Sequence, residues 1–334
     1  MRFPMLAIAA AVAMTAGTAP AQAQPAEEII LADPAFSLTF SAGYIASDLD
    51  LWGKHGIKVK TVQITGIGAI NSVISGSSHF AQASASSFGR ATARGQKLIA
   101  IATTIDRPFA QIVLRKEVAQ AAGFDPKAPL EKRAAVLKGR TIAVDSINSM
   151  IHAYVRLVVS RAGVNPDDVR IAPMAPNSML AAFQSKQIDG YAMSLPWPQK
   201  AVQDGEAFLI ASGPDGEPGD MIPFGHNLIV TRQDTCVQKK ALCRAMGQSI
   251  KDATAFIKTK PDEAFALLKK RFPTLDDKLL KASFDELQKV TPSPPVVNKA
   301  SIENSETFNV DAGLLKADEK LKSYDGIFTS EYVN

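Results

Sequence analysis

Short strand-like runs alternate with helix-like runs along the first part of the chain, and this alternation limits the fold more than any other feature. The periodicity predicts strands at 28–32, 57–64, 79–83 and 97–103, separated by helices at 41–52, 66–74 and 87–94. A strand–helix–strand succession places helices on both faces of a mainly parallel sheet. The chain is therefore predicted to have an α/β fold.

The same succession begins again near residue 140. Strands predicted at 140–144, 169–172, 188–193 and 207–211 alternate with helices at 149–162, 177–184 and 198–204. Two successive units of about 100 residues predict two lobes of similar construction. Extended runs at 111–116 and 227–231 flank the second unit and are expected to be two strands that cross between the lobes. The predicted organisation is a first lobe of 24–107 and 232–334, a second lobe of 108–231, and hinges near 107–112 and 225–231.

The amino-terminal residues 1–23 have the features of a cleavable secretory signal. Arg2 supplies a positive start, an apolar run follows over 5–16, and Ala21 and Ala23 form a small-x-small cleavage site. The apolar run is shorter than the roughly 20 residues that span a bilayer. An uncleaved amino-terminal anchor is the alternative. A periplasmic location is predicted.

Composition excludes few classes of protein but argues against nucleic-acid binding. The chain has 46% apolar and 21% charged residues, and its net charge is only +4, with opposite charges interspersed. Cys236 and Cys243 are the only cysteines, and in an exported protein a single local disulfide is expected. Two unpaired thiols are the alternative, because one cysteine is predicted before a helix and the other two turns inside it. No metal or cofactor is expected.

Several segments of the chain resemble, in order and spacing, one class of periplasmic binding protein. In the first unit these segments are Tyr44–Ala46, Leu51–Trp52, Gly56–Val59, Gly66–Gly68, Val73–Gly76, His79–Ala81 and Arg94–Leu98. In the second unit they are Leu137–Val144, Arg161–Val169, Ala181–Phe183, Gln187–Gly190 and Pro196. Together they resemble the nitrate/sulfonate/taurine (NMT1-like) class. Ser78–His79 departs from the acidic residue that this class usually carries.

The resemblance implies a two-lobed type II periplasmic binding protein fold with two crossing hinge strands. It also implies a solute-binding component of an ABC importer, a monomer that presents its ligand to permease subunits. The implied ligand is a small polar or anionic organic solute of the sulfonate, nitrate, carboxylate or small aromatic type. An exported sensor for a membrane receptor is an alternative. Yeast pyrimidine-precursor synthases resemble the same class, but they depend on a cysteine-rich motif that this chain lacks, so no enzyme activity and no catalytic residue are predicted.

Ligands of open α/β sheets bind beyond the carboxyl ends of the strands, so the loops after the strands supply the candidate site residues. From the first lobe these are Phe36, Ser37, Gly66, Ile67, Gly68, Ser84, Ser86 and Arg107. Gly66 and Gly68 either let the backbone approach a ligand or form a tight turn. Ser84 and Ser86 either bind the ligand or cap a helix. Arg107 either neutralises an anion or forms a hinge salt bridge.

From the second lobe and the second crossing the candidates are Ser146, Asn148, Ser149, Asn177, Trp197 and His226. The class usually places Ser, Thr or Gly after the strand at 140–144. Asp145 departs from an anion-binding expectation, and either caps the helix or contacts a ligand amine or hydroxyl. Asn177 can cap its helix or face the cleft. Trp197, like Phe36, can form an aromatic wall or pack against the hinge, and His226 is a pocket donor or a structural histidine.

Overall fold

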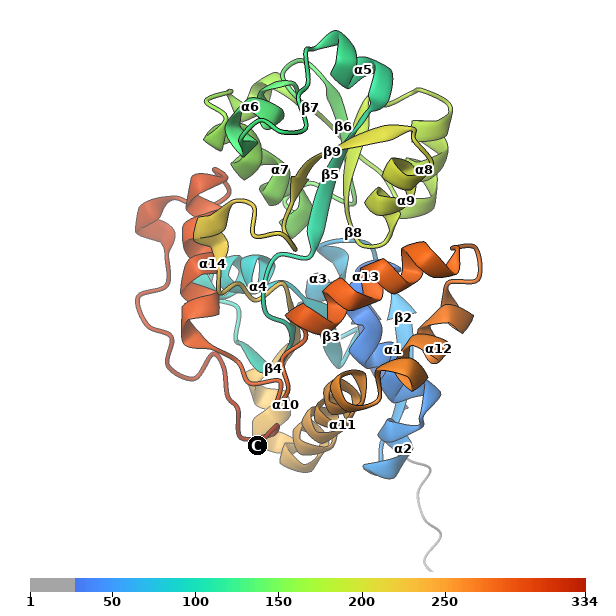
Figure 1. Cartoon of the computed structure of the whole chain (residues 1–334). Coiled ribbons are helices and arrows are strands. Elements are labelled where there is room, and N and C mark those ends of the chain that lie inside the picture. The colour runs from blue at the N-terminus through green and yellow to red at the C-terminus, as the bar shows by residue number, and fades with distance from the viewer. Residues whose placement is uncertain (1–27) are drawn as a thin grey trace, which may run out of the picture.

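The computed structural model describes residues 28–334, which form two α/β units, one above the other in Figure 1. The predicted signal at 1–23 lies outside the described residues. Each unit contains one five-stranded sheet. The prediction of a two-unit α/β fold is confirmed.

The first sheet has the strand order β2-β1-β3-β10-β4. Its strands are β1 (Glu28–Asp33), β2 (Lys58–Gln63), β3 (Phe80–Ala83), β4 (Leu98–Ile105) and β10 (Asn227–Arg232). β1 pairs in parallel with β2 and β3, and β10 runs antiparallel between β3 and β4. Alternate residues of β1 enter different cores, Leu31 on one face and Ala32 on the other. Apolar layers therefore cover both faces of this sheet, as expected where parallel strands are buried.

The second sheet has the order β7-β6-β8-β5-β9. Its strands are β5 (Ala110–Arg115), β6 (Thr141–Val144), β7 (Arg170–Pro173), β8 (Gly190–Ser194) and β9 (Ala207–Ser212). β6 is parallel to β7 and β8, while β5 is antiparallel to β8 and β9. The two sheets thus share one plan: three parallel strands followed by an antiparallel strand that arrives from the other side of a crossing.

The helices of both units lie close to the predicted positions. In the first unit they are α1 (Ser41–Asp48), α2 (Leu51–Lys54), α3 (Gly68–Ser75) and α4 (Ala85–Ala93). In the second they are α5 (Lys116–Ala121), α6 (Leu130–Ala135), α7 (Met150–Arg161), α8 (Pro176–Gln184) and α9 (Trp197–Gln203). The helix predicted at 41–52 is divided in two, because Asp50 adopts a left-handed conformation (φ 48°) and its carboxylate caps α2 at Gly53 N.

The two extended runs predicted to cross between the lobes do not cross as strands. β5 lies wholly in the second sheet and β10 wholly in the first, so the connections are the loops at 106–109 and 213–226. The boundary predicted at residue 231 is therefore placed too late, since β10 pairs with Ala83 and Thr103 of the first sheet. Apolar content made β10 look like a strand, but only its pairing partners decide which sheet it joins.

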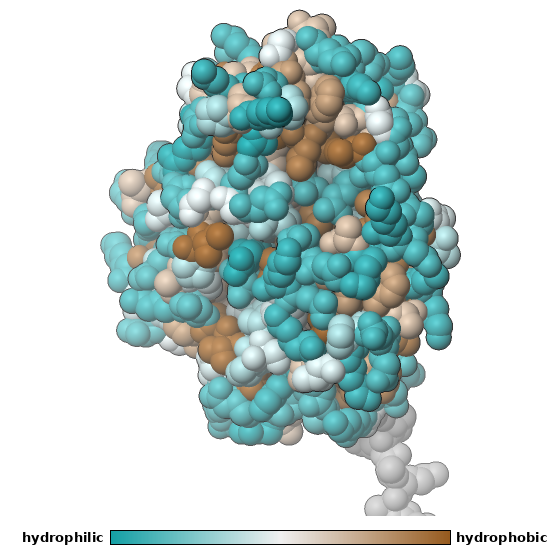
Figure 2. Space-filling model, viewed as in Figure 1, coloured by the Kyte–Doolittle hydropathy of each residue, from teal (hydrophilic) through white to brown (hydrophobic). Residues whose placement is uncertain are grey.

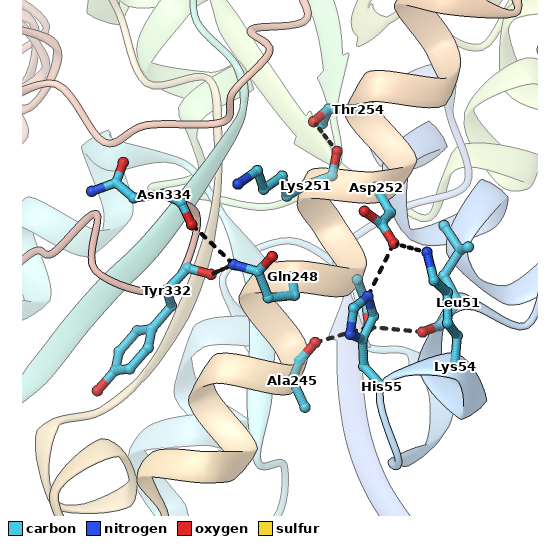
Figure 3. A network of polar contacts seen from close by, with 11 residues as sticks. Leu51, Lys54, His55, Ala245, Gln248, Lys251, Asp252, Thr254, Tyr332 and Asn334 are labelled. Carbon is cyan, nitrogen blue, oxygen red and sulfur yellow. Dashed lines mark hydrogen bonds and ion pairs between the residues drawn. The ribbon is translucent and has the colours of Figure 1, made fainter.

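The carboxyl-terminal part is helical, with α10 (Gln233–Gln238), α11 (Lys240–Thr259), α12 (Pro261–Arg271), α13 (Asp277–Val290) and α14 (Lys299–Asp311). Figure 3 shows how α11 holds the first unit together. Asp252 bonds Lys54 at the end of α2 (2.6 Å) and His55 just after it (3.0 Å), and Gln248 donates to the Tyr332 carbonyl at 2.8 Å. These contacts anchor both α2 and the chain end to one helix.

α14 does not belong to the first lobe alone, although the sequence placed all of 232–334 there. It packs along α4 and also meets α7 of the second unit (Figure 1). Phe308 enters the second unit's core beside Phe224, and Arg156 donates to the Ala312 carbonyl at 2.7 Å. This helix is a third physical connection between the units.

Cys236 and Cys243 form the predicted disulfide, with 5.5 Å between their Cα atoms. α10 ends before α11 begins, so a turn separates the two cysteines and Cys243 lies in the first turn of α11. That turn removes the spacing problem that a single helix would pose. On the face shown in Figure 2 hydrophilic residues predominate, and hydrophobic ones form separate spots. Within residues 28–334, no helix combines the length and hydropathy needed to cross a membrane.

Candidate functional site

A cavity of about 80 Å³ lies between the two units, and strand ends of both units line it. The first unit contributes Pro34, Ala35, Ser37, Thr39, Phe40, Gly66, Ile67, Ile70, Gln82, Ala83, Ser84, Ser87 and Asn227. The second unit and the crossing contribute Asp145, Ser149, Met150, Ile151, Pro176, Met193, Ser194 and His226.

The topology explains why these residues meet. The parallel strands β1, β2 and β3 end at the cavity, and so do β6, β7 and β8 of the second unit. The carboxyl ends of parallel strands share one edge of a sheet, where helices begin. Ser84 is the N-cap of α4 and Ser149 that of α7, so helix starts from both units face the same space.

A chain of buried polar groups lies under the first unit's side of the cavity. Gln82 Nε2 donates to Asp33 Oδ1 at 2.8 Å, and Asn227 Nδ2 donates to Gln82 Oε1 at 2.7 Å and to Thr104 Oγ1 at 2.6 Å. Burial raises the pKa of Asp33 to about 7, although the hydrogen bond from Gln82 and the charge of Arg271 oppose this. The network fixes the side chains of Gln82 and Asn227, which both line the cavity.

Asp145 occupies the second unit's side, at the amino end of α7. Its Oδ1 accepts a hydrogen bond from Ser149 Oγ at 2.5 Å, and Ser149 Oγ in turn accepts from His152 N at 3.1 Å. Burial raises the pKa of Asp145, and the hydrogen bond from Ser149 lowers it in part. His152 Nδ1 accepts from Asn148 N at 3.0 Å, which ties the loop to the first turn of the helix.

His226 lies at the crossing and is uncharged. Its Nδ1 accepts from Phe109 N at 3.3 Å, and burial lowers its pKa to about 3. The proton of the neutral ring is therefore on Nε2, which lies 3.4 Å from Ser194 Oγ. Thr39 is also part of the lining, and its Oγ1 is buried without a hydrogen-bond partner.

The candidates divide into those that line the cavity and those that do not. Ser37, Gly66, Ile67, Ser84, Ser149 and His226 are part of the lining. Phe36 and Trp197 instead pack with Phe272, at ring-centroid distances of 4.5 and 6.1 Å. Trp197 Nε1 also donates to the Phe36 carbonyl at 2.8 Å, so this pair joins the units beside the cavity rather than lining it.

Ser86, Asn148 and Ser146 take part in a contact between the units. Arg90 of α4 is buried and donates to Ser86 Oγ (2.9 Å), to Asn309 Oδ1 of α14 (2.5 Å) and to the backbone carbonyl of Asn148. Burial lowers the pKa of Arg90 to about 10, which still leaves it charged at neutral pH. Ser146 Oγ accepts from Ile67 N at 3.3 Å. These residues surround the cavity but do not line it.

The remaining candidates are Arg107, Asn177 and Gly68. Arg107 pairs with Asp106 at 3.4 Å, which is the hinge salt bridge weighed as its alternative role. Asn177 is exposed in the first turn of α8, and Gly68 is the first residue of α3. None of the three lines the cavity.

Three polar residues of the lining, Gln82, Asn227 and Thr39, were not among the candidates predicted from the sequence, and the sequence gives only weak signals for them. Gln82 interrupts the buried strand β3, Asn227 begins β10, and Thr39 lies in a short 3-10 helix, η1 (Leu38–Phe40). A polar residue in an otherwise apolar run calls for a partner or a ligand. Among the residues that the structure describes, no group of three or more His, Cys, Asp or Glu side chains is placed to hold a metal ion.

A two-unit α/β fold with one solute-sized cavity between facing strand ends defines the class of periplasmic binding proteins. The chain belongs to the NMT1/THI5-like family, whose model matches residues 38–264. A segment of 159 residues is 30% identical to a Brucella abortus protein that carries the provisional name of a binding protein. That segment covers 46% of this chain and 43% of the relative, so the match spans less than half of the relative's length.

Solved structures show the same fold at low sequence identity. A protein from Bordetella bronchiseptica superposes with a TM-score of 0.77 at 18% identity, covering 92% of this chain and 95% of that one. The alkanesulfonate-binding protein SsuA from Xanthomonas axonopodis pv. citri, bound to MOPS, has a TM-score of 0.70 at 18% identity, with 90% and 97% covered. The resemblance to this class that the sequence indicated is confirmed.

Proposed function

We propose that this protein is the extracytoplasmic solute-binding component of an ABC importer. It captures one small solute in the cavity between its units, closes on it and presents the closed form to permease subunits in the inner membrane. The observation that carries this proposal is the cavity itself, which neither unit forms alone. The function named for SsuA, binding of an alkanesulfonate, supports the general activity and leaves the solute to be determined.

Hydrogen bonds between the units surround the cavity on several sides. Leu38 N donates to the Leu195 carbonyl at 3.1 Å, and Ile67 N donates to Ser146 Oγ at 3.3 Å. Other bonds of this kind join Trp197 Nε1 to the Phe36 carbonyl and Gln203 Nε2 to Asp276 Oδ2, each at 2.8 Å, and each such bond is worth about 1 kcal/mol net. Closure held by such contacts is reversible, and a solute that bonds both units shifts the balance toward the closed form.

We further propose that residues 1–23 direct export and are removed, and that the mature chain is a periplasmic monomer without enzyme activity. The lining supports binding rather than turnover. His226 is the one histidine in it, and burial keeps that ring uncharged at neutral pH. Its Nδ1 is already bonded to Phe109 N, so it is poorly placed to serve as a general base.

The proposal is tested by pairing a ligand screen with a variant that blocks closure. A Cβ atom at Gly66 would lie 2.0 Å from Ser146 Oγ of the other unit, so Gly66→Ala should keep the units apart. Gly56→Ala is the matched control, because Gly56 has a similar positive φ (77° against 59°) but open space around its Cβ position. Both variants carry the backbone strain of about 1 kcal/mol, and only one carries the clash.

We expect a small solute from a panel of sulfonates, nitrate, carboxylates, aromatic acids and pyrimidines to raise the melting temperature of the mature protein. We also expect it to reduce the radius of gyration measured by X-ray scattering. Gly66→Ala should weaken this binding at least about tenfold, equivalent to 1.4 kcal/mol, while Gly56→Ala should not. Equal binding by both variants would show that closure over this cavity is not the binding event.

A further inference from the structure

A buried carboxyl group, that of Asp33, lies behind the first unit's side of the cavity. Asp33 ends β1 and is 3% exposed, and it is not itself part of the lining. In the described part of the chain its carboxyl accepts one hydrogen bond, from Gln82 Nε2 at 2.8 Å. Gln82 in turn accepts from Asn227, and both of these amides line the cavity. Asp33 is therefore connected to the cavity through two amide side chains.

The directions of these hydrogen bonds follow from the charge of Asp33. An ionised carboxylate only accepts, so the amide of Gln82 turns its Nε2 to Asp33 and its Oε1 to Asn227. Asn227 Nδ2 then donates to Gln82 Oε1 at 2.7 Å and to Thr104 Oγ1 at 2.6 Å. Both hydrogens of this amide are used, so the atom that Asn227 can offer to a solute is Oδ1, which only accepts.

A protonated Asp33 favours the opposite directions. While Gln82 donates to it, the new O–H has no acceptor, and a buried O–H without a partner is unfavourable. The oxygen and nitrogen of an amide have nearly the same shape, so Gln82 and Asn227 can turn over in place. Gln82 Oε1 then accepts from Asp33, and Asn227 Oδ1 accepts from Gln82 Nε2. The Thr104 hydroxyl donates to the same Oδ1, since a hydroxyl takes either role, and Asn227 Nδ2 is left for the solute.

Two charged or titratable groups face Asp33 from the helices packed against β1, Tyr44 of α1 and Arg271 of α12. Burial raises the pKa of Tyr44, so this phenol stays protonated. Arg271 donates to both carboxylate oxygens of Asp48, at 2.8 and 2.6 Å, and an arginine stays charged near neutral pH. β2 pairs Gln63 with Asp33, and β3 and α3 contain no charged residue. Asp33 is therefore the group that changes charge on this side of the cavity.

The change of charge falls close to neutral pH, because burial raises the pKa of Asp33 to about 7. His226, next to Asn227 in the chain, stays uncharged there, since burial lowers its pKa to about 3. Burial also raises the pKa of Asp145 on the opposite side of the cavity. A pH effect on binding thus has two possible sources, and the effect of Asp33 is the one that passes through Gln82.

We propose that Asp33 is a positioning residue that decides, through Gln82, which polar atom Asn227 presents to the solute: the acceptor Oδ1 when the carboxyl is ionised, and the donor Nδ2 when it is protonated. The proposal rests on the proposed function, because it assigns the specificity of the same cavity. Above neutral pH this wall selects a solute that donates an N–H or O–H hydrogen bond, and below neutral pH it selects one that accepts.

The first experiment is an NMR titration of the ligand-free mature protein between about pH 5.5 and about pH 8.5. The side-chain amide signals of Gln82 and Asn227 should shift with the same midpoint as the carboxyl carbon of Asp33, near pH 7. The nuclear Overhauser effect between the Asn227 amide hydrogens and Thr104 should be present above the midpoint and lost below it, because the amide turns over.

Two variants separate this positioning role from a purely structural one. Asp33→Asn removes the titrating group and should abolish the pH response of both amides. Gln82→Met removes the connection, so Asp33 should still titrate while the Asn227 amide no longer follows it. Asp125→Asn is the matched control, because it makes the same change at an exposed position outside the cavity lining and should leave the response unchanged. If a variant fails to fold, the wild-type titration still decides the question.

The second experiment compares two uncharged probes of the same shape, acetamide, which donates N–H bonds, and acetone, which only accepts. Their affinities are measured from the same NMR signals. The preference for acetamide over acetone should be at least about tenfold greater at the upper end of the pH range than at the lower end, because acetone leaves Asn227 Oδ1 without a donor. This pH dependence should disappear in Asp33→Asn and persist in Asp125→Asn.

Amide signals that do not follow Asp33, or a pH response that survives in Asp33→Asn, would overturn this inference and leave the binding function standing. Binding of both probes with a preference that does not change with pH would overturn it in the same way. If neither probe binds, the NMR titration alone decides the inference, and the ligand screen with Gly66→Ala decides the proposed function.

Discussion

The two sides of the cavity are held in different ways. The first wall comprises Thr39, Gln82, Ser84 and Asn227. The network from Asp33 to Thr104 fixes two of these side chains, Gln82 and Asn227, and all of its bonds lie within the first unit. The second wall comprises Asp145, Ser149, Met150 and Ser194. The loop at 145–149 in this wall is held from both units, because Asn148 N donates to His152 of its own unit and the Asn148 carbonyl accepts from Arg90 of the other. The first wall is therefore set by one folded unit, whereas the second is completed by contact between units.

This difference indicates that the two walls have different roles in binding. Polarity built into one rigid sheet is ready before a ligand arrives, which lowers the cost of binding. The loop at 145–149 gains a hydrogen bond from Arg90 when the units meet, so its conformation can depend on whether the units have closed over a solute. The buried titratable groups also differ, because Asp33 lies behind the first wall, whereas the second wall combines the carboxyl of Asp145 with the imidazole of His152 behind it. The pH dependence of Asp33 and of His152 is therefore tested separately.

The largest expected effect concerns Asp33. Its pKa is about 7 in the folded protein, above the ordinary value near 3.8, so the folded state retains a proton that the unfolded chain has lost. The contribution of Asp33 to the free energy of unfolding is therefore fully present below pH 4. As the pH rises to about 7, this contribution decreases by up to about 4 kcal/mol. In Asp33→Asn, urea unfolding between pH 4 and 7 should lack this loss. An unchanged pH slope would mean that Asp33 is ionised throughout.

The opposite slope is expected from His152, which lies behind the second wall. Burial, and then the charges of Arg156 and Arg90, lower its pKa to about 4. The unfolded chain binds a proton on this histidine near pH 6.5, whereas the folded protein does not bind it until about pH 4. The free energy of unfolding therefore falls by about 3 kcal/mol as the pH decreases from 6.5 to 4. His152→Asn keeps an acceptor for Asn148 N and should remove that fall. If the slope persists in the variant, another group is responsible.

A smaller effect is expected from loosening the second wall at Arg90. Arg90→Met keeps the length of the side chain but leaves Asn309 and the Asn148 carbonyl without their donor, at a cost of about 2 kcal/mol in the free energy of unfolding. Hydrogen exchange should become faster in residues 145–149 and stay unchanged at Gln82 and Asn227. Arg94→Met, on the exposed end of the same helix, is the control. Faster exchange at both walls would contradict the distinction between them.

Much of the fold follows from local sequence. The strands and helices of both units are short-range patterns, and the order in which they alternate requires parallel sheets with crossovers. The loops after the strands were correctly expected to surround the cavity, since the carboxyl ends of parallel strands share an edge. Ser37, Ser84 and Ser149 combine both possibilities weighed for such residues, because each accepts a backbone hydrogen bond as an N-cap and also lines the cavity.

Other features depended on residues far apart in the chain. Local periodicity identifies β10 as a strand, but its place between β3 and β4 comes from partners more than a hundred residues away. The same distance separates Asn227 from Gln82, so no sequence window shows that this amide faces the cavity or that its Nδ2 is already spent. Phe36 and Trp197 could have formed an aromatic wall or packed against the hinge, and Phe272, distant in the chain from both, draws them into packing between the units.

The sequence by itself thus determined the elements, their order and the edge of each sheet where a site would form, because these depend on bonds and burial within a few turns of chain. Only the tertiary structure decided which polar side chains form hydrogen bonds with one another and which remain able to bond a ligand. That choice depends on the pairing of Asp33, Arg90 and Asn227 with partners far away in the chain, which no local pattern can show.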